Sequence, residues 1–137
     1  MDLESNYVFY ECVNDGKCTL ESVVVQTMSG VNIYLGGGEE SHIGSVAVSI
    51  PRPSLTGDGS ISCTTSVFNL FSHKDDVLAV PLAEELSKQL NQVVVVSAGV
   101  HIEKITTEEI TRIKSNLGII KNLIMKRLNE YSEGVKI

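Results

Sequence analysis

The chain has 137 residues and a formal net charge of −6, a size at which one domain can bury a core of its own. With no tryptophan and only 5% aromatic residues, that core must consist mainly of valine, isoleucine and leucine. No stretch approaches the roughly 20 apolar residues that a membrane-spanning helix needs. The acidic start Met1–Glu4 does not resemble a secretion signal. These features predict one cytoplasmic domain over residues 1–137, with no membrane partner.

The charge is divided unevenly along the chain. Residues 1–87 hold three basic and twelve acidic residues, a net charge of −9, whereas residues 88–137 hold eight basic and five acidic residues, a net charge of +3. An acidic chain without a basic stripe argues against nucleic acid as the main partner. Two of the three early cations, Arg52 and Lys74, lie in polar segments next to other functional residue types. This placement predicts a local site for an anion.

The first part of the chain reads as strands and turns. Strands are predicted over residues 7–13, 18–28, 31–35, 42–50 and 60–70. Asn14-Asp15-Gly16 predicts a tight hairpin turn, so residues 1–35 form an N-terminal meander of antiparallel strands. Pro51 and Pro53 are expected to end the fourth strand, because proline cannot donate to a β-ladder. The fifth strand opens with hydroxyl residues that we expect to line a cleft.

The second part of the chain reads as helix, strand and helix. A helix capped by Asp75 or Asp76 is predicted to about Leu90, with a kink at Pro81 or a start near Val80. Four consecutive valines predict a strand over 92–98 that is buried on both faces. A capping box at 106–109 begins the last helix, and residues 132–137 are expected to form a frayed tail. Gly118, inside that helix, is interpreted as a point of close approach by the other helix.

The element order is therefore β-β-β-β-β-α-β-α. It predicts an α+β fold, in which two helices pack on one face of a mostly antiparallel sheet of about six strands. Cys12, Cys18 and Cys63 are odd in number and lack a Cys-x-x-Cys spacing, so they are interpreted as small buried hydrophobic residues. No nucleophile elbow surrounds Cys63 or the hydroxyl run after it. The residues themselves make no positive case for an enzyme.

The three histidines, His42, His73 and His101, each lie in a short polar segment at the end of an apolar run. If these ends converge, the three imidazoles could ligate zinc or another divalent ion, although no two of them share a short ligand spacing. A pocket for an anion or cofactor is a second interpretation. A purely structural role for the histidines is a third.

The glycine run 36–38, followed by His42 and Gly44, could turn backbone N–H groups toward a phosphate, or it could form a flexible hairpin loop. Arg52 lies between two prolines, which suits rigid contact with a phosphate or carboxylate; the alternative is an exposed arginine near an acid such as Asp58. Lys74 opposes the dipole of the following helix unless an anion also lies there.

Five short segments, in this order and spacing, resemble the prenylated-flavin chaperone-like proteins, the small accessory subunits associated with gallate decarboxylase. The segments are His42-Ile43-Gly44, Pro51-Arg52-Pro53-Ser54, Thr64-Thr65-Ser66-Val67, His73-Lys74-Asp75-Asp76 and Ala98-Gly99-Val100-His101. The resemblance runs from about residue 36 to residue 128. One departure is Ser72, which stands where the family segment has glycine before its His-Lys pair.

The resemblance implies a non-catalytic helper of UbiD-type aromatic-acid decarboxylases. Such a helper would bind the small anionic cofactor prenylated FMN, or FMN, and act as a homo-oligomer with sites between subunits. The cofactor-binding residues that this implies are Gly37, Gly38, His42, Gly44, Arg52, Ser54, Thr64, Thr65, His73, Lys74 and His101. Two alternatives stay open: a metal-dependent enzyme using the three histidines, and a structural subunit that only contacts a larger enzyme.

Overall fold

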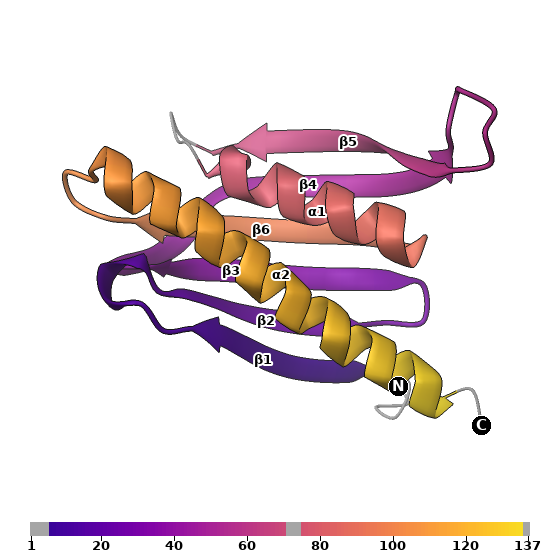
Figure 1. Cartoon of the computed structure of the whole chain (residues 1–137), viewed down its shortest axis with the longest axis horizontal. Helices are drawn as coiled ribbons and strands as arrows, with labels where there is room; N and C mark the ends of the chain where they lie inside the picture. The colour runs from indigo at the N-terminus through magenta and orange to yellow at the C-terminus, as the bar shows by residue number, and fades with distance from the viewer. Residues whose placement is uncertain (1–5, 71–74, 136–137) are drawn as a thin grey trace.

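Six strands form one sheet in the order β1-β2-β3-β6-β4-β5 in the computed structural model, which describes residues 6–70 and 75–135 (Figure 1). The strands are β1 (Tyr7–Val13), β2 (Leu20–Gln26), β3 (Gly30–Gly38), β4 (Glu40–Pro53), β5 (Ile61–Asn69) and β6 (Val93–His101). The helices are α1 (Asp76–Leu90), α2 (Thr107–Val135) and the short 3-10 helix η2 (Gly16–Cys18). The predicted α+β class and element order are confirmed.

Both long helices cover the same face of the sheet (Figure 1). α1 packs on β4, β5 and β6, and α2 crosses β1 and β2. Along each central strand, side chains buried under the helices alternate with side chains on the opposite face, because successive residues of a strand point to opposite faces. The core between the layers contains, among others, Leu20, Ile33, Leu35, Val94, Val96, Leu82 and Ile120.

β6 lies at the centre of the sheet, parallel to β3 and antiparallel to β4. The chain between β3 and β4 therefore folds around the end of β6. Gly38 and Glu40 both pair with His101, and the N–H of Glu39 donates to the His101 carbonyl at 2.8 Å. Gly38 has φ of +74°, a left-handed conformation that favours glycine at this bend. This path brings the start of β4 against the end of β6.

Two turn predictions at the strand ends are wrong. The Asn14–Gly16 segment forms no tight hairpin turn; it leads into η2, and Asp15 accepts bonds from Arg112 and Asn116 of α2. The prolines do not end β4, which continues to Pro53. Residues two apart in a strand direct their backbone N–H groups to the same side, so Pro51 and Pro53 both lack a donor on one side of β4. β6 pairs with β4 no further than Ser49. The missing donors therefore face no neighbouring strand.

The predictions for the helices are partly wrong. α1 spans Asp76–Leu90 with Asp75 at its N-cap position, as predicted, so the alternative start near Val80 is wrong. Pro81 lies inside the helix on the exposed side, where water can bond the carbonyl that proline leaves without a partner. Gly118 is not a point of close approach, since a Cβ placed there meets no atom within 4 Å. Helix α2 runs on to Val135, so it includes part of the segment predicted to be a tail.

Candidate functional site

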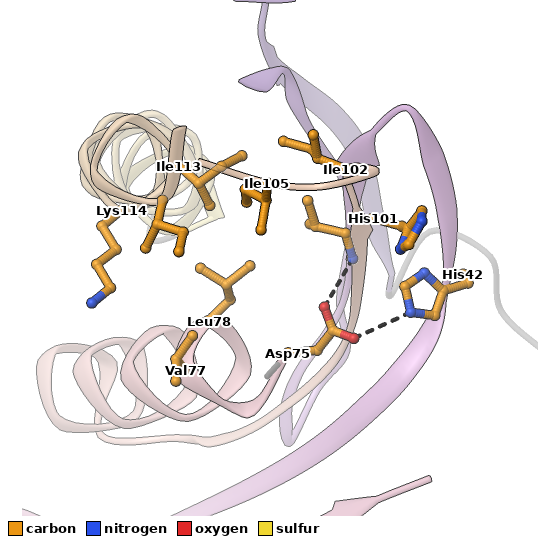
Figure 2. A pocket seen from close by; sticks show the side chains of 11 residues that line it. His42, Asp75, Val77, Leu78, His101, Ile102, Ile105, Ile113 and Lys114 are labelled. Carbon is orange, nitrogen blue, oxygen red and sulfur yellow. Dashed lines mark hydrogen bonds and ion pairs between the residues drawn. The ribbon is translucent and has the colours of Figure 1, made fainter. Parts of the chain in front are cut away.

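A pocket of about 440 Å³ opens between the first turns of α1 and α2 and the adjoining ends of β4 and β6 (Figure 2). Its apolar walls come from both helices and from the loop that joins β6 to α2. They include Val77, Leu78, Ile102, Ile105, Ile110 and Ile113. The polar side chains among the described lining residues are His42, Asp75, His101 and Lys114. In Figure 2 the histidines and Lys114 lie on opposite sides of this pocket.

Asp75 is the buried polar group of the pocket, with only 5% of its surface exposed. Its Oδ1 accepts the backbone N–H of Val100 at 3.0 Å, and its Oδ2 lies 3.2 Å from Nε2 of His42 (Figure 2). Asp75 was expected to cap a helix, and it does hold the N-cap position of α1, but its carboxylate makes no capping bond. The carboxylate instead joins the helix to β4 and β6, and both oxygens are paired, as burial of a charge requires.

The His42–Asp75 pair depends on two glycines. A Cβ on Gly44 would overlap the Asp75 carboxylate, and a Cβ on Gly99 would overlap the His42 carbonyl. A register shift in β4 between Ser41 and Ser45 carries His42 out of the regular ladder at this point. Gly44 was predicted to contribute to a cofactor cradle. In the structure it makes room for the ion pair that lines the pocket.

His101 lies beside His42, with the two ring centroids 6.4 Å apart and the rings nearly perpendicular at 78°. Its side chain is half exposed, and its Nε2 lies 3.3 Å from a carboxylate oxygen of Glu103. The Glu103 backbone N–H donates in turn to Glu39, in the bend between β3 and β4. The structure thus brings together two of the predicted histidines at one edge of the pocket.

The predicted phosphate ligand Arg52 lies at the opposite end of the sheet. It pairs with Ser62 of β5 in the ladder, and its Nε donates to Thr64 Oγ1 at 2.9 Å. Ser54 follows in the adjoining loop, where its hydroxyl bonds to Thr56 at 2.8 Å. The structure therefore does not bring Arg52, Ser54 and Thr64 to the pocket.

Thr65 points to the other side of the sheet from Thr64, toward α1. The Thr65 hydroxyl donates to Glu84 at 2.7 Å and lies 2.8 Å from the Ser49 hydroxyl. Thr65 has one hydroxyl hydrogen, so Ser49 is the donor in the second bond. The hydroxyl run of β5 therefore faces two sides of an edge strand and lines no single cleft. Its alternation follows directly from the strand period.

The glycine run belongs to strand β3, which was expected to end at Leu35. A Cβ on Gly37 would overlap the Thr19 carbonyl, and the N–H of Gly38 donates to that same carbonyl at 3.0 Å. These glycines permit close approach of backbone to backbone. The Gly38 N–H group is already bonded within the protein, so it does not form the expected phosphate cradle.

His73 and Lys74 lie outside the described residues. Within residues 6–70 and 75–135, no group of three or more histidine, cysteine, aspartate or glutamate side chains is arranged to hold a metal ion. The pocket, as described, suits a ligand with an apolar body and a hydrogen-bonding edge, since apolar walls with a few polar groups are typical of small-molecule sites. The sequence did not identify Asp75 as a pocket residue. It also did not predict that the isoleucines Ile102, Ile105, Ile110 and Ile113 line the pocket.

Comparison with known proteins identifies the family. Residues 14–129 match the prenylated flavin chaperone LpdD-like domain, and the chain belongs to this family, as the five segments predicted. It also resembles a chain in the crystal structure of a chaperone complex for yeast 20S proteasome assembly. That likeness has a TM-score of 0.53 at 14% identity and covers 86% of this chain and 97% of that chain, which shows a shared fold. The comparison with curated proteins found no match.

None of the helices in the described part of the chain combines the length and the apolar character that crossing a bilayer requires.

Proposed function

We propose that this protein binds prenylated FMN in the pocket between α1 and α2 and hands it to a UbiD-type decarboxylase. Membership of the prenylated flavin chaperone family supports a role with this cofactor. The observation that carries the proposal is the pocket itself, whose apolar walls end at the His42–Asp75 pair. Its volume of about 440 Å³ falls within the range of small-molecule sites.

The pocket residues suggest how the cofactor would be held. The ring system and its prenyl-derived ring would pack against the isoleucines of the loop and of α2. His42 and His101 would bond to the polar edge of the rings. Lys114 lies on the other side of the pocket, and among the described lining residues it is the lysine or arginine that can pair with the phosphate (Figure 2). This assignment replaces the sequence-based one, in which Arg52 held the phosphate.

The role is binding without covalent chemistry. No serine, threonine or cysteine is present among the described residues that line the pocket. Besides the histidines, the groups of the described lining with nucleophilic character are Asp75, whose two oxygens are already paired with His42 and the Val100 N–H, and Lys114, which lies on the opposite side of the pocket from His42 (Figure 2). We therefore propose an accessory protein that protects and delivers a cofactor, acting on the decarboxylase and not on its substrate.

Titration with prenylated FMN and with FMN, followed by flavin fluorescence, tests the proposal. Ile105 is 41% exposed, so Ile105→Trp can fill the pocket from outside without disturbing the core, and it should abolish binding. Arg52→Ala, at the far end of the sheet, is the matched control and should bind as the wild type does. Binding of neither flavin, or binding that Ile105→Trp leaves unchanged while Arg52→Ala removes it, would overturn the proposed site.

Delivery is tested separately with an apo-decarboxylase of the UbiD type. The loaded protein should restore decarboxylation faster than the same concentration of free cofactor, and the Ile105→Trp variant should give no such gain. A protein that binds the decarboxylase but no flavin would instead be a structural subunit. The cytoplasmic location and the homo-oligomeric state stay predictions from the sequence.

A further inference from the structure

The face of the sheet turned away from α1 and α2, here called the open face, is not covered by any helix or strand in the described part of the chain (Figure 1). Its side chains are those that alternate along the strands with the buried ones. Large apolar side chains are exposed there on five strands. Examples are Val8 (61%), Tyr10 (53%), Val23 (43%), Ile50 (52%), Phe68 (69%) and Val93 (36%). The solvent face of an antiparallel sheet is ordinarily polar, so this composition indicates a surface that is covered.

The charge of the open face argues for one kind of partner. Among the described open-face positions of the strands, taking β4 from Ser45 onward, the formal charges are Glu21 and Arg52, which cancel. They lie near opposite ends of the sheet, where β2 begins and β4 ends, with the apolar side chains between them. The whole chain carries −6, so two copies repel through most of their surfaces but not through this one. A strongly basic or acidic partner would find no complementary charge on it.

Three polar side chains of the open face already have partners within the chain. The Tyr10 hydroxyl donates to Glu21 at 3.1 Å, and Arg52 donates to Thr64 at 2.9 Å. The Tyr34 hydroxyl donates to the His42 carbonyl at 3.0 Å. Covering the face would therefore leave none of these three donors without an acceptor. The side chains of Asn32, Ser62, Ser66 and Ser97 lie on the same face and would need hydrogen-bond partners across the interface.

We infer that the open face binds the open face of a second copy of this chain, giving a face-to-face homodimer. Six strands about 4.8 Å apart, with seven residues of about 3.3 Å rise each, span roughly 550 Å² per copy. Two such faces bury about 1,100 Å², which passes the roughly 1,000 Å² expected of a specific interface. The flavin pocket lies among the helices on the other side of the sheet, so the dimer leaves both pockets open. The inference goes beyond the proposed function and does not depend on it.

Sedimentation of the full chain without ligand tests the dimer. The wild type should sediment at twice its chain mass of 14.9 kDa at micromolar concentration. Val23→Glu places a charge on the open face and should raise the dimer dissociation constant by roughly tenfold or more. Ile119→Glu is the matched control, since Ile119 is 48% exposed on α2, and this variant should remain a dimer. Circular dichroism and flavin titration verify that each variant is folded.

Each contrary outcome overturns the inference. A wild type that is monomeric at 100 micromolar, or a dimer that Ile119→Glu disrupts and Val23→Glu does not, excludes the open face as a homodimer interface. If the wild type stays monomeric and binds the decarboxylase, and Val23→Glu weakens that binding, the open face is an interface with the decarboxylase and not with a second copy. If Val23→Glu fails to fold, Val23→Thr, which keeps a β-branched side chain, should still weaken the dimer; an unchanged dissociation constant contradicts the proposal.

Discussion

Gly44 of β4 and Asp75 at the start of α1 lie so close that no side chain at position 44 could coexist with the present carboxylate position. The backbone of Gly44 is not left-handed, so its requirement for glycine comes from the space that Asp75 and the neighbouring His42 Nε2 occupy. Asp75 needs the space because its carboxylate reaches both His42 and the Val100 N–H. The glycine is thus part of the pocket's construction, although it does not itself line the pocket.

Gly44→Ala should lower the free energy of unfolding by about 1–3 kcal/mol, because the added methyl group must displace the Asp75 carboxylate or the strand. Urea denaturation measures the loss. Gly118→Ala is the control, since a Cβ there meets nothing within 4 Å and alanine is favoured over glycine in a helix by up to about 1 kcal/mol. We expect that variant to be more stable than the wild type; a loss at Gly118 or none at Gly44 contradicts this account.

Asp75→Asn and Asp75→Ala should differ in stability. The asparagine keeps an oxygen that can accept the Val100 N–H, whereas the alanine leaves that N–H without its partner, which costs about 1–3 kcal/mol. Both variants lose the ion pair with His42 and should bind flavin less tightly. Chemical denaturation together with flavin titration separates the two effects. Equal stabilities for the two variants would show that the Val100 bond contributes little.

Thr65→Val should weaken folding and leave flavin binding unchanged. The hydroxyl of Thr65 connects Ser49 of β4 to Glu84 of α1, and its removal costs about 1 kcal/mol. The residue lies outside the pocket lining, in contrast to its sequence-based assignment as a cofactor ligand. Thermal unfolding and flavin titration of the same sample decide between the two roles. A loss of flavin affinity without a loss of stability would restore the earlier assignment.

The stability of the protein should fall in acid partly through Asp15. Hydrogen bonds from Asn116 and Arg112 of α2 hold the pKa of Asp15 below its usual value of 3.8. A carboxyl whose pKa is lowered by folding stabilises the native state above the unfolded value, and that stabilisation is lost as the pH falls through the lower folded value. Melting temperatures measured from pH 6 down to pH 2.5 should therefore decline less steeply below about pH 4 for Asp15→Asn than for the wild type.

The sequence predicted the parts of this structure that depend on local periodicity. The alternation in Tyr7–Val13 placed β1 with its observed bounds, and the capping box at Thr106 is present, with Glu109 and Thr106 exchanging hydrogen bonds. Whether the histidines converge was left open by the sequence, and the structure brings His42 and His101 together at neighbouring strand ends. Each of these features is set by residues within a few positions of one another or by a strand end.

The misplaced residues depend on which strands are neighbours, and the local pattern does not carry that information. Pro53 looks like a strand end until β6 is known to stop short of it. Gly37 looks like a loop until the Thr19 carbonyl is found against it. Arg52 and His42 belong to the same strand, but a strand of 14 residues carries its two ends to opposite sides of the molecule.

The late position of β6 in the chain has a consequence for synthesis on the ribosome. β1, β2 and β3 can pair as they emerge, and so can β4 and β5, but the two groups have no shared ladder until residues 93–101 join them. Contacts between segments so distant in sequence form slowly, because the intervening chain must first be closed into a loop. The nascent protein therefore exposes two incomplete sheet edges until residues 93–101 have emerged, and the pocket, which α2 helps to line, forms later still.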